Sequence, residues 1–359
     1  MGCVSASTLA IGRAGTLIGR LSGADLNLTE YAAAALPALQ SGVGFDGWCL
    51  ELADPGSSLP IAVAYDDPPL GDRLPQFWQF EFAGAGRGPA PRLPVFAAAC
   101  RRDPTGARRF AELLRPGGVA DELRCWFVVD RIRWGSLGLF RSQGGRPFSE
   151  EDAAAVTEVL APLAVGVRRA WFTADLPSGK ADMTEPGTLL FGRTGALVSQ
   201  TSAARHWLSQ VDASYSMVLA MLAMLETTPT TSLRTRTATG TWLRLSGSRL
   251  LPPAGAATVA VTVQPAVPAE ITPLLMRAYG LTPRQRTVAR LVLTGQSTRQ
   301  IAAALHVSHH TVNDHVRAVA DKTGVRSRGQ LAAVLTGLPP TAADDRERDL
   351  ESPAEVEIV

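Results

Sequence analysis

The pattern of hydrophobic and polar positions differs between the two ends of the chain. Before residue 266, short runs such as TGTWLRLSGSRL and ATVAVTVQP alternate apolar and polar residues with a period of two, which predicts half-buried strands. Apolar stretches such as LTEYAAAALPALQ and SYSMVLAMLAMLE predict helices between them. After residue 280 the apolar residues recur every three or four positions, which predicts helices only. We therefore expect a multidomain α+β protein that ends in an all-α module.

The strands and helices before residue 173 are separated by recognisable turn and cap residues. The run LRCWFVVDRIRWGSLGLFRS predicts two strands that bend near Gly135 and Ser136. Ser149 is the expected N-cap of a long helix, with acidic residues in its first turn, where they suit the helix dipole. Pro162 is expected to kink this helix or to end it early. The Gly- and Ser-rich residues 1–24 are expected to be poorly ordered.

Helix signals are most regular between residues 281 and 336. Thr282, followed by Pro283 and Gln285, predicts an N-cap, and Ser297 and Ser308 are the expected N-caps of the next two helices. In the third of these helices Val312, Val316 and Val319 share one face. The polar residues of the opposite face are His310, Asn313, Asp314 and Arg317. Two short helices joined by such a tight connection are typical of a helix-turn-helix.

Charge is distributed unevenly over this pattern. The whole chain has a formal net charge of only +2, but residues 281–336 carry eight basic and two acidic residues. Residues 337–359 carry seven acidic and two basic residues and are expected to be disordered. A basic module followed by an acidic tail indicates a polyanionic partner for the module.

The residues LTPRQRTVARLVLTGQSTRQIAAALHVSHHTVNDHVRAVADKTGVRSRGQL resemble the LuxR/FixJ-type DNA-binding domain. The resemblance implies a tetrahelical fold whose third helix enters the major groove of double-stranded DNA. It implies base contacts for Asn313, Asp314 and Arg317, and His310 lies on the same face. It also implies phosphate contacts for Ser308, Thr311 and Arg328. The family's usual residues differ at Gln285, Thr298, Arg299 and Asn313.

Two weaker resemblances concern the upstream part. The runs GFDGWCLEL, CWFVVDRIRWGSLGLFRS and RPFSEEDAAAVTEVLAPLAVGV resemble a GAF domain, and TLLFGRTGALVSQTSAARHWL with WLRLSG resembles a PAS fold. Both resemblances imply sensory α/β domains. The side chains of Cys49, Cys125, Trp48, Trp126 and Trp134 either line a ligand pocket or pack in the core. The expected division is a flexible segment 1–24, a GAF-like domain 25–172, a linker 173–186, a PAS-like domain 187–265, a linker helix 266–280, the helix-turn-helix domain 281–336 and the tail 337–359.

Candidate chemistry adds little to this outline. The four cysteines are widely spaced, and the clustered histidines lack neighbouring cysteines, so neither a disulfide framework, a metal site nor a cofactor is expected. No run of ~18 apolar residues is present, which favours a soluble cytoplasmic protein without membrane contact. No nucleophile motif or phosphate-binding loop is visible, so an enzyme is not expected.

The sequence thus predicts a sequence-specific DNA-binding transcriptional regulator whose third helix spans residues 309–322. Its activity would be modulated through the GAF/PAS-like half, with a small-molecule ligand possible in the GAF-like domain. A homodimer is expected because one recognition helix covers only a short half-site. The alternative is a ligand- or protein-binding sensor whose helical module makes protein contacts, and Asp314 on the polar face is the feature that favours it.

Overall fold

The structure is a computed structural model that divides the chain into two compact units. The first comprises residues 1–177 and 181–265, and the second residues 178–180 and 266–359. The structure describes residues 6–24, 26–66, 73–82, 95–96, 104–130, 132–172, 184–212, 214–251 and 258–337. Most of the expected linker 173–186 and nearly all of the expected acidic tail 337–359 lie outside these residues.

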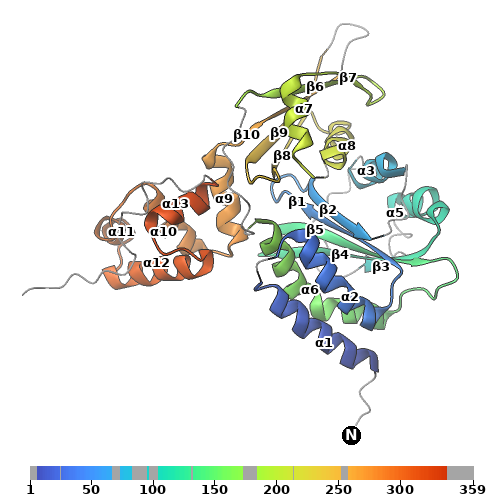
Figure 1. Ribbon diagram of the computed structural model, residues 1–359, viewed down its shortest axis with the longest axis horizontal. Coiled ribbons are helices and arrows are strands. Elements are labelled where there is room, and N and C mark those ends of the chain that lie inside the picture. Colours follow the sequence, from blue (N-terminus) through green and yellow to red (C-terminus); the bar gives the residue numbers. More distant parts are fainter. Residues whose placement is uncertain are drawn as a thin grey trace, which may run out of the picture. The chain divides into compact units, whose positions relative to one another are not determined.

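The first unit begins with a five-stranded antiparallel sheet in the order β2-β1-β5-β4-β3. Its strands are β1 (Gly47–Ala53), β2 (Pro60–Asp66), β3 (Val95–Phe96), β4 (Val119–Val129) and β5 (Ile132–Ser142). Its helices are α1 (Ala6–Leu21), α2 (Leu28–Val43), α3 (Leu74–Phe82), α5 (Pro104–Arg109) and α6 (Glu150–Phe172), with a π-helical turn (Phe110–Leu114) and a 3-10 turn (Arg115–Gly117) after α5. In Figure 1 helices α1, α2 and α6 lie on one side of this sheet, and α3 and α5 lie on the other.

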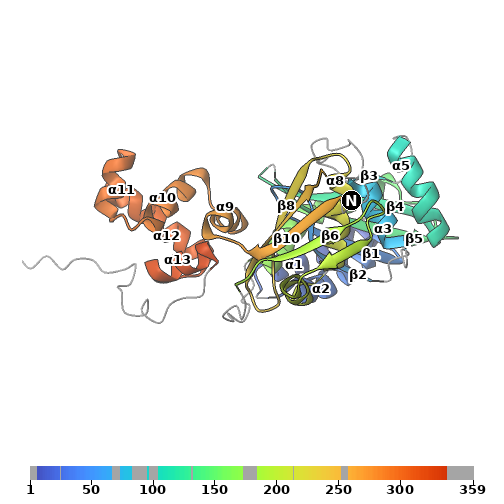
Figure 2. The ribbon, with the colours of Figure 1, turned by 90° about the horizontal axis from the view of Figure 1, so that it is seen from above.

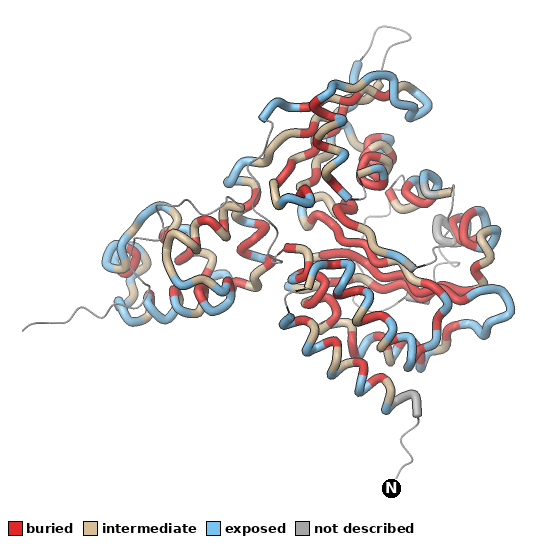
Figure 3. Tube along the Cα trace, viewed as in Figure 1, coloured by how far each residue is buried: buried red, intermediate tan, exposed pale blue. Residues whose placement is uncertain are grey.

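The sheet face towards α2 and α6 is an aliphatic core. Leu50, Leu137 and Cys125 face this side in register on β1, β5 and β4, and each is fully buried. Figure 3 shows buried positions along the central strands. The predicted helix LTEYAAAALPALQ and the predicted strand GFDGWCLEL are confirmed as parts of α2 and β1.

The N-terminal segment, expected to be flexible, is instead the helix α1 over Ala6–Leu21. Its apolar residues Ile11, Ala14 and Ile18 are buried, and α1 packs on α2 and α6. Glycines lower the helix propensity of an isolated peptide, but the burial of one apolar face overrides this preference. The expectation was wrong because it was based on the Gly and Ser content of residues 1–24. The i, i+3, i+7 spacing of these three apolar residues predicts a helix.

Two further expectations in this region concern the β4–β5 bend and Pro162, and the bend expected near Gly135 and Ser136 was wrong. The hairpin between β4 and β5 turns at Asp130, which has a positive φ of 52°, and Gly135 lies inside β5, paired with Phe127 and Leu52. Of the two alternatives expected at Pro162, the early end is wrong, because α6 continues to Phe172. The backbone oxygen of Pro162 accepts a hydrogen bond from Ser22 Oγ at 2.9 Å, which joins this point of α6 to the end of α1.

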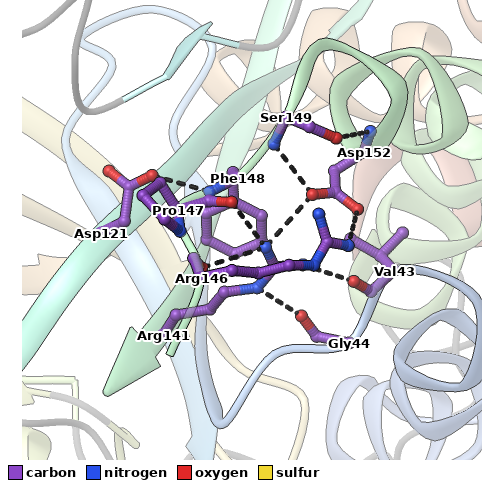
Figure 4. Close-up of polar contacts among 9 residues, drawn as sticks. All are labelled: Val43, Gly44, Asp121, Arg141, Arg146, Pro147, Phe148, Ser149 and Asp152. Atoms are coloured by element: carbon purple, nitrogen blue, oxygen red, sulfur yellow. Dashed lines mark hydrogen bonds and ion pairs between the residues drawn. The ribbon is translucent and has the colours of Figure 1, made fainter. Parts of the chain in front are cut away.

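A cluster of polar side chains holds the end of α2 and the start of α6 to strand β5 (Figure 4). The Arg141 guanidinium, on β5, donates to the backbone oxygens of Val43 and Gly44 at the end of α2, at 2.5 and 2.7 Å. It also pairs with Asp152 in the first turn of α6, at 3.1 Å. Ser149 and Asp152 exchange side-chain to backbone hydrogen bonds, which confirms Ser149 as the predicted N-cap. Arg141 therefore links β5, α2 and α6.

The second part of the first unit is another five-stranded antiparallel sheet, in the order β7-β6-β10-β9-β8. Its strands are β6 (Gly187–Phe191), β7 (Leu197–Gln200), β8 (Thr230–Arg236), β9 (Trp242–Arg249) and β10 (Val259–Pro265), and its helices are α7 (Ser202–Ser209) and α8 (Ser214–Leu225). The predicted strands TGTWLRLSGSRL and ATVAVTVQP correspond to β9 and β10, whereas β8 was not predicted from the sequence.

Contacts join the two sheets of this unit closely. Helix α3 packs along α8, and β2 contacts β8. The fully buried Asp54 carboxylate accepts hydrogen bonds from the backbone N–H and the guanidinium of Arg234 on β8, at 2.6 to 2.8 Å. The segments that were expected to be separate GAF-like and PAS-like domains therefore form one compact unit.

In its described residues the second unit consists of helices, which are α9 (Pro268–Ala278), α10 (Pro283–Leu293), α11 (Thr298–Leu305), α12 (His309–Thr323) and α13 (Arg328–Thr336). Figures 1 and 2 both show α9 beside α13, and these two helices pack against each other. Among the described residues no single helix is long and apolar enough to cross a membrane, although the bent pair α7 and α8 would meet that length and composition together.

Candidate nucleic-acid interface

Helix α12 separates its apolar and polar residues onto two faces. Val312, Val316 and Val319 are buried, at 0, 6 and 1% exposure, against the other helices of the module. The four polar residues predicted on the opposite face are exposed to solvent. They are His310, Asn313, Asp314 and Arg317. A helix that is anchored by valines and presents polar side chains outward has the form that a DNA major groove accepts.

The start of α12 carries two hydroxyl groups in contact with one another. Ser308 is the N-cap, and its Oγ accepts a hydrogen bond from the Thr311 backbone N–H at 3.1 Å. The two side-chain oxygens of Ser308 and Thr311 lie 2.9 Å apart, so one hydroxyl donates to the other. The hydrogen of the second hydroxyl can then be donated outward. An N-terminal helix turn with its N–H groups and such a donor suits a phosphate oxygen.

Arg328 lies at the start of α13 and has a structural role inside the module. Its Nη1 donates to the backbone oxygen of Gln296 at 2.9 Å, and its Nη2 donates to Thr298 Oγ1 at 3.0 Å. These two hydrogen bonds hold α13 to the turn before α11. A guanidinium has five N–H donors, so Arg328 retains donors for a phosphate while it is fixed by the protein.

The connection between α11 and α12 is a turn of three residues that is closed by local contacts. His306 caps the end of α11 in the left-handed conformation, with φ 53° and ψ 46°. The N–H of Val307 bonds to the oxygen of Ala302. The N-terminus of α10 is also capped by neighbouring residues, because Thr282 and Gln285 exchange side-chain to backbone hydrogen bonds. Each predicted N-cap of the module, at Thr282, Ser297 and Ser308, is confirmed.

Some basic side chains of the module stabilise its fold. Lys322 Nζ donates to the oxygen of Gly280 at 2.8 Å and to Gln285 Oε1 at 2.9 Å. Arg284 donates to the backbone oxygen of Leu305 at 3.3 Å. Arg290 and Arg299 are exposed. The positive charge that the sequence predicted is thus partly used in helix packing and partly presented to solvent.

The described part of the chain was compared with the requirements of a metal site and of a reactive cysteine. No group of three or more His, Cys, Asp or Glu side chains there could hold a metal ion. Burial raises the pKa of the Cys49 and Cys125 thiols to about 12, so neither forms a thiolate near neutral pH.

The five residues considered as a pocket lining in the first unit do not share one site. Cys49 and Trp126 face the α3 side of the sheet, whereas Cys125 and Trp48 face the opposite side with Leu50. The Trp134 ring packs edge-to-face against the Phe172 ring of α6, with ring centroids 5.1 Å apart. The pocket formed by all five residues is therefore excluded, because alternating strand residues point to opposite faces.

Helices α10 to α13, with a three-residue turn between α11 and α12, define a helix-turn-helix module. Residues 280–335 match the family described as bacterial regulatory proteins, luxR family. The spore germination protein GerE of Bacillus subtilis (strain 168) is 36% identical over 55 residues, which are 15% of this chain and 74% of GerE. The chain belongs to the luxR family of bacterial regulatory proteins.

Solved structures also resemble the chain, at low identity. Escherichia coli SdiA is 12% identical, with a TM-score of 0.32 over 91% of this chain and 98% of SdiA. A Vibrio cholera VqmA–ligand–DNA complex is 17% identical, with a TM-score of 0.22 over 46% of this chain and 88% of VqmA. These superpositions are too loose to assign a fold family to residues 1–265.

Proposed function

We propose that this protein is a sequence-specific DNA-binding transcriptional regulator in which α12 enters the major groove. The observation that carries the proposal is the division of α12 into a buried valine face and an exposed face with His310, Asn313, Asp314 and Arg317. Membership of the luxR family of regulators supports it. No catalytic role is part of this proposal.

The exposed side chains of α12 suit different base edges. An arginine such as Arg317 can donate two hydrogen bonds to guanine, and an asparagine such as Asn313 can pair with adenine. The Asp314 carboxylate can accept from the amino group of cytosine but is repelled by phosphate. Ser308, Thr311 and Arg328 would hold the phosphate backbone and set the register of the helix.

Electrophoretic retardation of the full chain on a random duplex library, followed by selection, tests the proposal. We expect a preferred site to emerge, and we expect the affinity to fall steeply between low and physiological salt, because each neutralised phosphate releases counterions. Arg317→Ala should cost about 1–3 kcal/mol and relax the preference at one base. Arg193→Ala, an exposed arginine in the turn after β6, is the matched control and should change nothing. Salt-independent binding would contradict the proposal and favour a protein-binding role for the module.

We also propose that the regulator acts as a homodimer and that the first unit modulates it. Two half-sites read by two copies would give the two-fold operators that helix-turn-helix proteins use. Two apolar helices that could offer dimer contacts, α8 and α9, are already packed within their own units. Met217 and Met221 of α8 and Met276 of α9 are fully buried. The exposed face of α6 remains a candidate. Light scattering of the free and DNA-bound protein tests this, and a monomer in both states would contradict it.

A further inference from the structure

The start of α11 and the start of α13 lie together in the second unit. Arg328, the first residue of α13, donates to Thr298 Oγ1 at the start of α11, at 3.0 Å, and to the backbone oxygen of Gln296 at 2.9 Å. Arg299 directly follows Thr298, and Arg326 lies two residues before Arg328. These hydrogen bonds therefore bring three arginines to one place. We call Arg299, Arg326 and Arg328 the arginine cluster.

Positive charge dominates the arginine cluster. Arg299 and Arg326 are exposed, and Arg328 is half-buried. Neither α11 nor α13 has an acidic residue in its first turn. The two acids of the helix-turn-helix module, Asp314 and Asp321, both belong to α12. The N–H groups at a helix start carry partial positive charge, which adds to that of the guanidinium groups. The cluster is therefore suited to an anionic partner.

The residues that follow α13 carry the opposite charge. Residues 338–359, which we call the acidic segment, contain seven acidic and two basic residues. The segment lies outside the described residues, and Gly337 connects it to the end of α13. Its first two acids, Asp344 and Asp345, are adjacent and come before its first arginine. Charge complementarity thus makes the acidic segment of the same chain a candidate partner for the arginine cluster.

The acidic segment is long enough to reach the cluster. The cluster lies at the start of α13, whereas the segment leaves from the end of that helix. A helix of nine residues is about 14 Å long. The seven residues from Gly337 to Asp344 can span up to about 23 Å. A chain that turns back along α13 can therefore place Asp344 and Asp345 beside the arginine cluster.

We propose that the acidic segment binds the arginine cluster in the absence of DNA, with Asp344 and Asp345 beside Arg299 and Arg326. Arg328 of the cluster is also a proposed phosphate contact, so the segment and DNA compete for the same guanidinium groups. The segment is thus an autoinhibitor of DNA binding. Its effect on DNA rests on the proposed function, whereas its contact with the arginine cluster does not.

The covalent connection is what makes this contact effective. Ion pairs between exposed side chains are individually weak. A connection through a few residues gives the acids an effective concentration on the order of millimolar at the cluster. DNA has to displace the acidic segment, so the intact chain binds DNA more weakly than a chain whose segment is uncharged. Since the segment contacts no base, this reduction is the same for all DNA sequences.

NMR spectra of the arginine Nε–Hε groups in the full chain test the contact without DNA. The variant is Asp344→Asn with Asp345→Asn and Glu347→Gln, which leaves every described residue unchanged. We expect the Arg299 and Arg326 signals, assigned with single arginine-to-lysine variants, to differ between the wild type and this variant. Salt at about 0.5 M should move the wild-type signals to the variant's positions, because it screens exposed ion pairs. Signals that coincide at low salt would overturn the proposal.

Electrophoretic retardation on a random duplex library tests the competition. The same variant should bind about tenfold more tightly than the wild type at low salt, because a few exposed ion pairs together correspond to about that factor. The difference should disappear towards about 0.5 M salt. Glu112→Gln with Glu185→Gln and Asp212→Asn is the matched control, since it removes three exposed acids from the first unit. An equal gain in the control would mean that only the net charge of the chain matters, and it would reject the contact.

Arginine variants locate the binding site of the acidic segment. In a chain with Arg299→Gln and Arg326→Gln, the amide changes in the segment should no longer increase the affinity for DNA. Arg193→Gln with Arg205→Gln removes the same charge from exposed positions of the first unit, and the gain should persist there. A gain that survives loss of Arg299 and Arg326 would place the segment elsewhere and contradict the proposal.

The two measurements separate this proposal from the proposed function. Salt-dependent shifts of the Arg299 and Arg326 signals in a chain that does not bind DNA would support the contact and reject only the proposed function. DNA binding that is equal in the wild type and the segment variant, together with coinciding NMR signals, would reject only the contact.

Discussion

The Arg141 guanidinium and the Asp152 carboxylate form a buried ion pair, with 3.1 Å between Nη1 and Oδ2. Arg141 also donates to four backbone oxygens, at the end of α2 and in the loop before α6, and its guanidinium lies 4.0 Å from the Phe148 ring centroid. Burial by itself would raise the pKa of Asp152, but the Ser149 N–H, Arg141 and Arg146 hold it below its ordinary value. One guanidinium thus orients two helices on the sheet.

Arg141→Ala should therefore destabilise the first unit by about 3–5 kcal/mol, because Asp152 and the helix-end oxygens lose a buried partner. Arg146→Ala is the matched control. Arg146 contacts the same carboxylate at 3.0 Å, but its side chain is 64% exposed, and its loss should cost less than about 1 kcal/mol. Urea unfolding followed by tryptophan fluorescence measures both, because all seven tryptophans belong to the first unit. Equal effects of the two variants would contradict the assigned role of Arg141.

Gly166→Ala should destabilise the contact between α6 and α2. A Cβ on Gly166 would lie 2.1 Å from the Tyr31 hydroxyl oxygen, and Tyr31 is only 1% exposed. We expect a loss of about 1–3 kcal/mol from overpacking. Gly12→Ala in α1 is the control, since a Cβ there meets nothing within 4 Å and alanine favours a helix by about 1 kcal/mol. The same urea titration compares them, and a stabilising Gly166→Ala would show that Tyr31 can move aside.

The stability of the first unit should fall in acid through Glu81. Burial by itself would raise its pKa, but the guanidinium groups of Arg124 and Arg109 lower it to about 2 in the folded protein, from an ordinary value of 4.5. The stabilisation is therefore complete above about pH 4.5 and is lost as the pH falls towards 2. The difference corresponds to on the order of 3 kcal/mol. Glu81→Gln should be less stable than the wild type at pH 6, and the gap should close towards pH 2. A gap that stays constant over this range would refute the assignment.

Asp314→Asn should strengthen non-specific DNA binding, because it removes a negative charge from the exposed face of α12. If Asp314 also reads a cytosine, one base preference should disappear in a binding-site selection. Asp321→Asn, the same charge change on an exposed acid two turns further along α12, is the control and should leave the preferred site unchanged. A higher affinity with an unchanged site for both variants would mean that Asp314 only repels phosphate.

The sequence by itself determined the helices of the second unit and the two faces of α12. Their N-caps at Thr282, Ser297 and Ser308 bond to backbone groups three residues away, and the valines of α12 repeat within one helix. Such signals are local, so neither their position nor their meaning depends on distant parts of the chain. The roles of His310, Asn313, Asp314 and Arg317 in reading bases remain predictions, since exposure alone assigns no base.

Only the tertiary structure decided which polar residues of the first unit are buried. Glu122, Arg124 and Trp126 alternate with Leu123, Cys125 and Phe127 along β4, a pattern typical of a strand with one face in water. The structure instead covers that polar face, because Glu81 reaches Arg124 from 43 residues earlier, and Arg109 reaches Glu122. Ser136 meets Glu51 across 85 residues, and the bulge at Gly135 turns Arg133 towards the same face. The periodicity of a single strand does not predict contacts with residues far away in the sequence. A buried charge is tolerated only where an oppositely charged partner from elsewhere in the chain pairs with it.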